Sequence, residues 1–431
     1  MISEIKDVFE KINKDRYVIG FDLNNRFAQL SYCRIDGTDP ETLSTVAGEE
    51  QYNIPAVILK KKANNQWVIG NAAEEAFRAG EGFIVSDLLV KSMKGENVRM
   101  GTEEYKAEDL LILFIKRAFA LLPLMTSPDK IASVVVTVRH ADTDTMKILG
   151  KLPELLKLED EKIHFLSYEE SFFFYMLYQK QDLQNHQVML CDSSEGFLNI
   201  YRLEKNRFVT PAIAGVENFP YEDFVFGPNS ASGQEMDRRF LNIADHLCEN
   251  RIISSVYLIG EGFYGDWCNE SLKFLCKNRH VFKGNNLFSK GACLAAKEYY
   301  SPSGYEKNLR FFGKDRIQAN VGVTIKEKGE EKEEMFITAG EHWYEVGKTK
   351  EFLLHETDTV PVFIDMISKR NRVGADLKLQ GLSVKSGRMT RISLTIKMKS
   401  EKTVQFVAKD LGFGEIYPST GLEWTEELAL D

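Results

Sequence analysis

Two polar turns, each entered from an apolar stretch through an aspartate, are the first candidates for chemistry in this sequence. Asp22 begins the turn in VIGFDLNNRFAQLSY (18–32), and Asp192 begins the turn in MLCDSSEGFLNIYRL (189–203). An aspartate at a hairpin turn often accepts hydrogen bonds from the turn's own backbone. A second interpretation is that the two carboxylates face one common ligand.

The composition limits the kind of ligand and partner. The 431 residues include 55 Lys and Arg against 64 Asp and Glu, which gives a formal net charge of −9. This balance argues against a nucleic-acid partner, because binding to a phosphate backbone needs a basic face. The scattered cysteines contain no CxxC pair, so we expect reduced thiols and no zinc site. Without a signal-peptide core or an apolar span, the sequence predicts a cytoplasmic protein without a membrane partner.

Strands and helices alternate around the first turn. The apolar spacing predicts helices over 1–15, 71–79, 107–122, 143–156 and 167–181, and strands over 17–23, 26–35, 132–138 and 162–166. The aromatic run Phe172–Tyr175 is too apolar for an exposed helix face, so we expect its helix to pack between the two halves of the molecule.

The same pattern restarts around the second turn. We expect strand, turn, strand, turn and strand over 186–210, a strand over 255–262, and helices over 232–250, 266–278 and 289–300. Two halves that each open on a hairpin with an aspartate predict an internal duplication. From about residue 313, roughly eight short alternating strands predict an all-β sandwich or barrel.

Residues 17–300 resemble the ATPase domain of the DnaK-type seventy-kilodalton heat-shock chaperones, within the actin-like ATPase superfamily. The similarity is low in identity but keeps the same order along the chain. It rests on GFDL (20–23), NIPAVI (53–58), WVIGNAAEEAF (67–77), SVVVTV (133–138), LSYEESFFFYML (166–177), MLCDSSEGFLNIYRL (189–203), SGQEMDRRFLN (232–242), VYLIGEGFYGDW (256–267) and LFSKGACLAA (287–296).

The resemblance implies an α/β fold of the actin-like (ribonuclease-H-like) type, with a duplicated two-lobe ATPase core. It places the first lobe at 1–165 and the second lobe at 166–312, which includes the interdomain helix and the return helix 289–300. A sandwich-like all-β domain follows at 313–431, in the position of the chaperones' peptide-holding domain, although no motif of that domain matches here.

The resemblance also implies a site for ATP or ADP with Mg²⁺. Asp22 and Asp192 match carboxylates that surround the Mg²⁺–water cluster in the family, and Glu169, next to Glu170, matches a glutamate that faces the active site. These residues are therefore the candidate catalytic residues Asp22, Asp192 and Glu169, with the two aspartates as metal ligands through water. A glutamate at a helix start is also favoured by the helix dipole alone. The candidate nucleotide-binding residues are Asn24, Asn25, Arg26, Ser193, Ser194, Gly196, Gly260 and Gly262.

The hairpins depart from the family's pattern. Close approach of backbone N–H groups to phosphate favours glycine, but the first turn contains none and the second contains only Gly196. Glu195 would face the polyphosphate, and two like charges about 4 Å apart interact by roughly 4 kcal/mol. This charge opposes binding unless Mg²⁺ or Arg26 compensates for it.

Two further departures concern the water and the base. Glu74 stands where the family's helix carries a lysine that helps to orient the hydrolytic water, although Lys91 or Lys94 could enter from nearby. Helix 232–250 leads almost directly into strand 255–262, so the second lobe lacks the insertion subdomain that sandwiches the base.

These departures predict a degenerate member of the superfamily. We expect an intracellular protein-binding or scaffold module with a protein or peptide partner, rather than an enzyme. Two alternatives stay open, namely an active Mg²⁺-ATP-dependent ATPase or chaperone with an altered site, and an actin-like assembly protein. The cofactor is accordingly ATP or ADP with Mg²⁺, or none.

Overall fold

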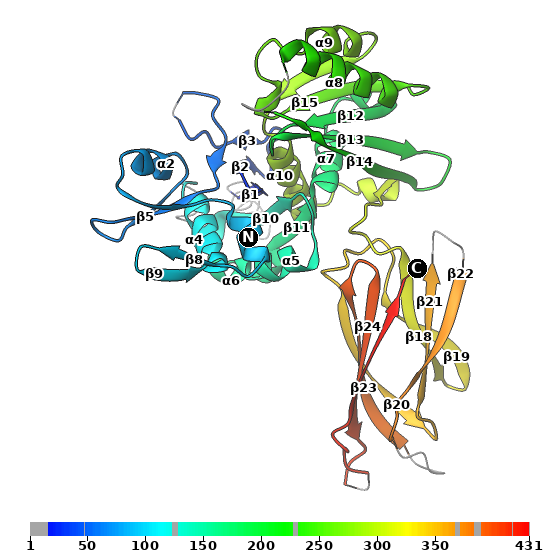
Figure 1. The fold of residues 1–431 in the computed structure, drawn as a ribbon. Helices are drawn as coiled ribbons and strands as arrows, with labels where there is room; N and C mark the ends of the chain where they lie inside the picture. Colours follow the sequence, from blue (N-terminus) through cyan, green and yellow to red (C-terminus); the bar gives the residue numbers. More distant parts are fainter. Residues whose placement is uncertain are drawn as a thin grey trace, which may run out of the picture. The chain divides into compact units, whose positions relative to one another are not determined.

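The computed structural model describes residues 16–46, 48–122, 128–226, 232–366, 371–382, 389–415 and 417–430. The helix predicted over residues 1–15 lies outside these ranges. The chain divides into two compact units, Met1–Phe311 and Phe312–Asp431 (Figure 1). The mixed α/β class is confirmed, and no described helix is long and apolar enough to cross a membrane.

The first sheet of the first unit is built around the strand that ends at the first turn. Its strands are β1 (Tyr17–Leu23), β2 (Phe27–Arg34), β3 (Glu41–Thr42), β4 (Ile54–Pro55), β10 (Ile131–Val138) and β11 (Ile163–Ser167). They are ordered β11-β10-β1-β2-β3, and β4 pairs with β2. β1 is antiparallel to β2 and parallel to β10, and β10 is buried along its whole length.

The second sheet is built around the strand that ends at the second turn. Its strands are β12 (Gln187–Asp192), β13 (Phe197–Asn206), β14 (Ala212–Val225), β15 (Ile253–Ile259), β16 (His280–Gly284) and β17 (Leu309–Phe311), in the order β16-β15-β12-β13-β14-β17. β12 is antiparallel to β13 and parallel to β15. Both sheets therefore have a hairpin on one side of the central strand and two parallel strands on the other.

One predicted strand of this sheet is wrong. The apolar residues Phe208 and Val209 suggested that the third strand lies within 186–210, but they are exposed in the turn between β13 and β14. The Oδ1 atom of Asn206 accepts a hydrogen bond from the N–H group of Phe208 at 3.0 Å, which turns the chain there. The third strand, β14, accordingly begins only at Ala212.

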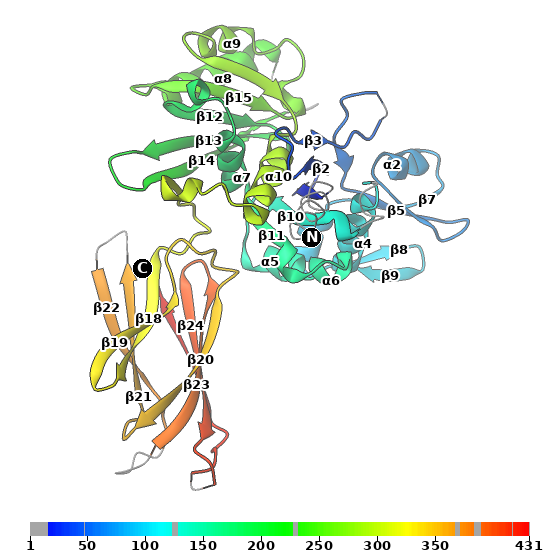
Figure 2. The ribbon, with the colours of Figure 1, turned by 180° about the vertical axis from the view of Figure 1, so that it is seen from behind.

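Two helices, α7 (Tyr168–Leu177) and α10 (Leu287–Tyr300), lie between the sheets (Figure 2). Phe172, Phe173 and Phe174 are buried in a core cluster that draws on both sheets, as the aromatic run predicts. Two glycines allow the backbones to approach closely. A Cβ atom on Gly20 of β1 would lie 2.1 Å from the Ser289 carbonyl oxygen, and one on Gly291 of α10 would lie 2.0 Å from the Ser171 carbonyl oxygen of α7.

The remaining elements of the first unit flank these sheets. They are β5 (Ile58–Lys61), β6 (Trp67–Ile69), α2 (Gly70–Arg78), β7 (Gly82–Val85), α3 (Leu88–Met93), β8 (Asn97–Met100), β9 (Glu103–Lys106), α4 (Ala107–Phe119), α5 (Thr143–Leu149), α6 (Leu152–Leu156), α8 (Gly233–Cys248) and α9 (Asn269–Leu275). The single helix predicted over 143–156 is two short helices, because Gly150 ends α5 and Pro153, which has no N–H donor, lies in the first turn of α6.

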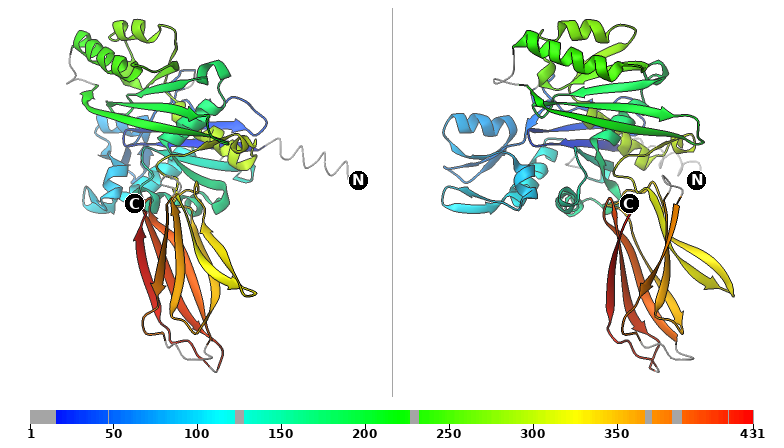
Figure 3. Two further views of the ribbon diagram at one scale, coloured as in Figure 1. Left: turned by 90° about the vertical axis from the view of Figure 1, so that its right-hand side faces the viewer. Right: turned by 45° about the vertical axis from the view of Figure 1, so that its right-hand side comes forward.

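The second unit consists of strands in two antiparallel four-stranded sheets (Figure 3). One sheet has the order β19-β18-β21-β22 and the other the order β20-β23-β24-β25. The strands are β18 (Ala319–Glu327), β19 (Glu330–Ile337), β20 (Gly347–His355), β21 (Thr359–Met366), β22 (Asn371–Lys378), β23 (Met389–Ser400), β24 (Thr403–Gly412) and β25 (Glu423–Ala429). Alternate residues of β23 are buried, as expected for a sheet with one covered face.

Candidate functional site

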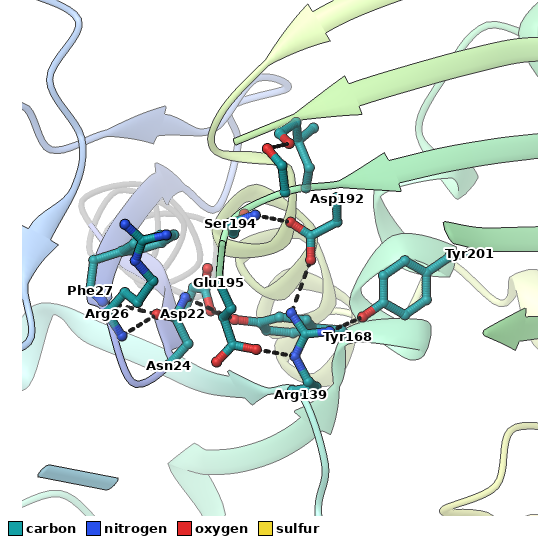
Figure 4. A network of polar contacts seen from close by, with 12 residues as sticks. Asp22, Asn24, Arg26, Phe27, Arg139, Tyr168, Asp192, Ser194, Glu195 and Tyr201 are labelled. Carbon is teal, nitrogen blue, oxygen red and sulfur yellow. Dashed lines mark hydrogen bonds and ion pairs between the residues drawn. The ribbon is translucent and has the colours of Figure 1, made fainter. Parts of the chain in front are cut away.

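The two turn aspartates lie in one buried cluster, although they come from different sheets (Figure 4). Asp22 is the second-last residue of β1 with 2% of its surface exposed, and Asp192 is the last residue of β12 with none exposed. The Tyr168 hydroxyl, from the first turn of α7, donates a hydrogen bond to Asp22 Oδ1 at 2.6 Å. β1 is paired with the parallel strand β10, and β12 is paired with the parallel strand β15. The residues that follow β10 and β15 therefore lie near the two carboxylates.

Arg139 is the central residue of this cluster, and the sequence analysis did not identify it (Figure 4). Its Nη2 atom lies 3.2 Å from Asp192 Oδ2, its Nε atom pairs with Glu195 Oε2, and its Nη1 atom donates to the Tyr201 hydroxyl at 3.3 Å. The guanidinium carbon lies 5.5 Å from the centre of the Tyr168 ring. A cation from the end of β10 thus links the first sheet to the second hairpin.

The structure therefore corrects one expectation about charge. Glu195 is neutralised by Arg139, whereas Arg26 is exposed and lies against the backbone of Gly196, where a Cβ atom would be 2.8 Å from Arg26 Nη1. The sequence could have indicated Arg139 through its position directly after the predicted strand 132–138. Charged residues at the carboxyl end of a parallel strand commonly face a site.

The first hairpin satisfies its own backbone. Asn24 Oδ1 accepts hydrogen bonds from the N–H groups of Arg26 and Phe27, both at 2.9 Å, and Asn24 Nδ2 donates to the Tyr168 hydroxyl at 3.3 Å. Asn25 Oδ1 accepts from the Val90 N–H group of α3 at 3.1 Å. The two amide side chains predicted to bind nucleotide are therefore both used within the protein.

The second hairpin is satisfied in the same way. Ser194 N–H donates to Asp192 Oδ1 at 2.8 Å, and Gly196 N–H donates to the Ser193 carbonyl at 3.1 Å. The Ser193 hydroxyl donates to the Ile259 carbonyl at 2.9 Å and accepts from the Gly262 N–H group at 3.0 Å. The hydroxyl that was expected to face a ligand instead joins the hairpin to the turn after β15.

Gly260 and Gly262 lie in that turn, and contacts within the protein account for both. Gly260 has φ of +91°, and a Cβ atom on it would lie 2.6 Å from the Ser193 hydroxyl. A Cβ atom on Gly262 would lie 2.5 Å from the Phe226 ring, which belongs to an aromatic group with Phe263. Neither glycine needs a nucleotide to explain it.

Glu169 and Glu170 are both buried in the first turn of α7. Tyr168, immediately before them, is the residue of this helix that contacts Asp22. The position of Glu169 in the first turn of α7 agrees with the second interpretation of this residue, in which the helix dipole stabilises its carboxylate.

A cavity of about 460 Å³ opens beside the cluster. Its walls come from both hairpins, α3 and the segment that follows β10, through Leu23, Asn24, Asn25, Arg26, Asp87, Leu89, Val90, Met93, Val138, Arg139, His140, Asp142, Thr145, Glu195 and Phe197. The helix that lines the cavity is α3, and Glu74 of α2 is not among the lining residues. Lys91 Nζ donates to the Ser86 carbonyl and pairs with Asp87, so its charge is used on the helix itself.

Burial controls the ionisation of the cluster. It raises the pKa of Asp22 to about 8, with further contributions from the charges of Asp192 and Glu195, while the Tyr168 hydrogen bond opposes the shift. Burial also raises the pKa of Asp192, although Arg139 and Ser194 act against it. Asp22 is consequently a neutral acid at pH 7, while Arg139 remains a cation. In the part of the chain that the structure describes, no three or more His, Cys, Asp or Glu side chains group to hold a metal ion.

Comparison with known families follows the division into two units. A model described as "Family of unknown function (DUF5716) C-terminal" matches residues 39–314, and one described as "Domain of unknown function (DUF8552)" matches residues 316–430. The boundary between these matches is close to the boundary between the compact units. No curated protein matches the chain.

Proposed function

This chain belongs to the family described as DUF5716 C-terminal, a family of unknown function, and we propose that it is a protein-binding or scaffold module on a degenerate actin-like, DnaK-type core. The two lobes are held together by Arg139 without nucleotide. The C-terminal unit, or the cleft between the lobes, engages a protein or peptide.

The arrangement of strands supports the actin-like part of this proposal. Both sheets have a central strand with a hairpin on one side and two parallel strands on the other. Each central strand carries an aspartate at or next to its last residue, before a turn, and α7 and α10 lie between the sheets. Only residues 249–252 separate α8 from β15, so there is no room for a base-binding insertion at that point.

The Arg139 cluster is the observation that carries the functional proposal. In an ATPase of this type, Mg²⁺ brings positive charge to the carboxylates between the hairpins. Here the Arg139 guanidinium supplies that charge from within the chain, and only 13% of its side chain is exposed. The hairpin N–H groups of Arg26, Phe27, Ser194 and Gly196 already have acceptors. These residues do not fit a Mg²⁺-nucleotide, and we derive no hydrolytic step from them.

We predict that Mg²⁺-ATP and Mg²⁺-ADP at millimolar concentration will not stabilise the chain through the two hairpins, so that any shift of the thermal unfolding midpoint is the same in the wild type and in the Asp22→Asn, Asp192→Asn variant. A ligand at 100 times its dissociation constant would stabilise the folded state by about 2.7 kcal/mol, which corresponds to a rise of about 4 °C for a unit of about 300 residues. Differential scanning fluorimetry with matched MgCl₂ controls makes the measurement.

The control is the Asp22→Asn, Asp192→Asn double variant. A rise in the wild type that this variant abolishes would show that the hairpins hold phosphate. Phosphate release above that of the same variant would then favour the active ATPase. Light scattering that increases steeply with protein concentration would favour the assembly protein instead.

The second unit offers the surface that we propose for the partner. A cavity of about 580 Å³ lies between β22 and β25, which are edge strands of the two sheets. Asp376, Glu423, Glu426 and Lys378 are among its lining residues, so acidic side chains outnumber basic ones. Trp424 also lines it and donates from Nε1 to the Gln380 carbonyl at 2.9 Å. An exposed strand edge can accept an extended peptide, and this charge favours a basic one.

We therefore expect an alternating Lys–Val octapeptide to bind the full chain and to change the fluorescence of Trp424. An alternating Glu–Val octapeptide should not bind. Reversal of two charges in Asp376→Lys, Glu426→Lys should weaken binding several-fold, while the same reversal on the far edge strand β19, Glu330→Lys, Glu331→Lys, should leave it unchanged. Equal binding of the two peptides would rule out this groove as a site for a basic segment.

A further inference from the structure

A second pocket of about 460 Å³ lies at the turn between β13 and β14, and it shares no lining residue with the cavity beside the Arg139 cluster. Lys205 lines it from the end of β13, Arg207 lines it from the turn, and Lys307 lines it from the segment before β17. The pairing of β14 with β17 fixes these segments side by side, with a hydrogen bond of 2.9 Å from Ala212 N–H to the Asn308 carbonyl. Three cations thus converge on one pocket from two parts of the chain.

The charge of this pocket is not balanced from within. No carboxylate is among its described lining residues, and the structure records no ion pair for Lys205, Arg207 or Lys307 among the residues it describes. Lys205 Nζ donates to Gln184 Oε1, which is a neutral acceptor. Burial, and next the charge of Arg207, lowers the pKa of Lys205 to about 8. The negative charge of an anion in the pocket would stabilise the charged form of Lys205 and so offset both of these unfavourable contributions.

The pocket also offers neutral groups that can complete an anion site. The Thr210 hydroxyl and the Asn308 amide belong to lining residues and can donate hydrogen bonds. Arginine and lysine together provide a planar fork and a compact charge, the pair commonly used for phosphate. The volume is within the range of about 300–1,000 Å³ typical of small-molecule sites.

We propose that this pocket binds the phosphate group of an anionic ligand. A singly charged carboxylate would leave most of the three formal positive charges unbalanced, whereas a phosphate monoester carries about −2. The phosphate can come from a free compound or from a lipid headgroup. Phe208 bears on this choice, because it is fully exposed at the tip of the same turn, next to Arg207, where it could enter an anionic lipid surface.

Calorimetric titration of the full chain with pyrophosphate tests the site. We expect saturable binding that the Arg207→Gln, Lys307→Gln variant weakens by at least about tenfold, the loss that corresponds to one charge-assisted hydrogen bond. The matched control is Arg238→Gln, Lys277→Gln, which removes two exposed cations from the same half of the molecule, away from the pocket. This control should bind as the wild type does. Both double variants should retain the wild-type circular dichroism spectrum, because the replaced side chains are exposed.

Sedimentation with vesicles of phosphatidylcholine that contain phosphatidylserine or a phosphoinositide distinguishes the two sources of phosphate. Vesicle binding that Phe208→Ser abolishes, with pyrophosphate binding unchanged, would identify a lipid headgroup. Pyrophosphate binding without vesicle binding would identify a free phosphate compound. The proposal is overturned if the wild type binds neither probe, or if pyrophosphate binds the two double variants equally, since it would then occupy another part of the chain.

Discussion

Replacement of Arg139 by methionine is expected to lower the free energy of unfolding of the first unit by about 3–5 kcal/mol. The substitution keeps much of the side-chain volume but leaves the Asp192 and Glu195 carboxylates without their shared cation. Asp192 is fully buried, so water cannot solvate its carboxylate after the cation is removed. Chemical denaturation followed by pulsed hydrogen exchange of β1 and β12 peptides measures this loss separately from the second unit.

Two further variants show whether uncompensated charge is the cause. Arg239→Met breaks an ion pair with Asp223, and 80% of the Asp223 side chain is exposed. This variant should lower the free energy of unfolding by no more than about 1 kcal/mol. Adding Asp192→Asn and Glu195→Gln to Arg139→Met removes the stranded charges and should restore part of the stability. If Arg139→Met cost no more than Arg239→Met, the guanidinium would not be what joins the two sheets.

The stability of the first unit is also expected to depend on pH through Asp22. Its folded-state pKa of about 8 lies above the ordinary value of 3.8, so folding favours the protonated form. The contribution to stability is complete below the unfolded-state pKa and is lost progressively as the pH rises to about 8. Each pH unit in this window corresponds to about 1.4 kcal/mol, so the wild type should lose about 4 kcal/mol between pH 5 and pH 8 from this group.

Comparison with Asp22→Asn isolates that contribution. Asparagine resembles the protonated acid in shape and keeps an oxygen for the Tyr168 hydroxyl, so this variant should have a smaller slope of unfolding free energy against pH. The exposed Asp129→Asn serves as the matched control and should follow the wild type. The pulsed-exchange measurement described for Arg139 applies here between pH 5 and pH 9. Parallel curves for wild type and Asp22→Asn would mean that Asp22 ionises normally in the folded protein.

The hairpins and their aspartates were predictable because the evidence is local. An apolar run, an aspartate and a polar turn occupy neighbouring positions at both Asp22 and Asp192, and the alternation of strands indicates that each aspartate lies close to the end of a strand. The aromatic run of α7 was equally informative, since such a face must be buried. These features depend on residues within a few positions of one another.

Arg139 was missed because its role depends on distant parts of the chain. It meets Asp192 and Glu195 only through the parallel pairing of β1 with β10 and through the contact between the two halves. Helix α3, which lines the cavity, was also missed, because its six residues make too few turns for a clear apolar period. Phe208 and Val209 misled because apolar residues normally indicate a strand, whereas these are exposed at a turn.

The close contacts of Gly20 and Gly291 affect how this chain can diverge from its relatives. At either position the smallest side chain would meet a backbone oxygen, which cannot move aside as a flexible side chain would. Substitutions in the hairpins can accumulate once no ligand depends on them, but a mutation at these glycines disrupts the contact of α10 with β1 or α7 whatever the protein binds. Distant members of the family should therefore be easier to recognise by these two glycines, at the right separation along the chain, than by any phosphate-binding motif.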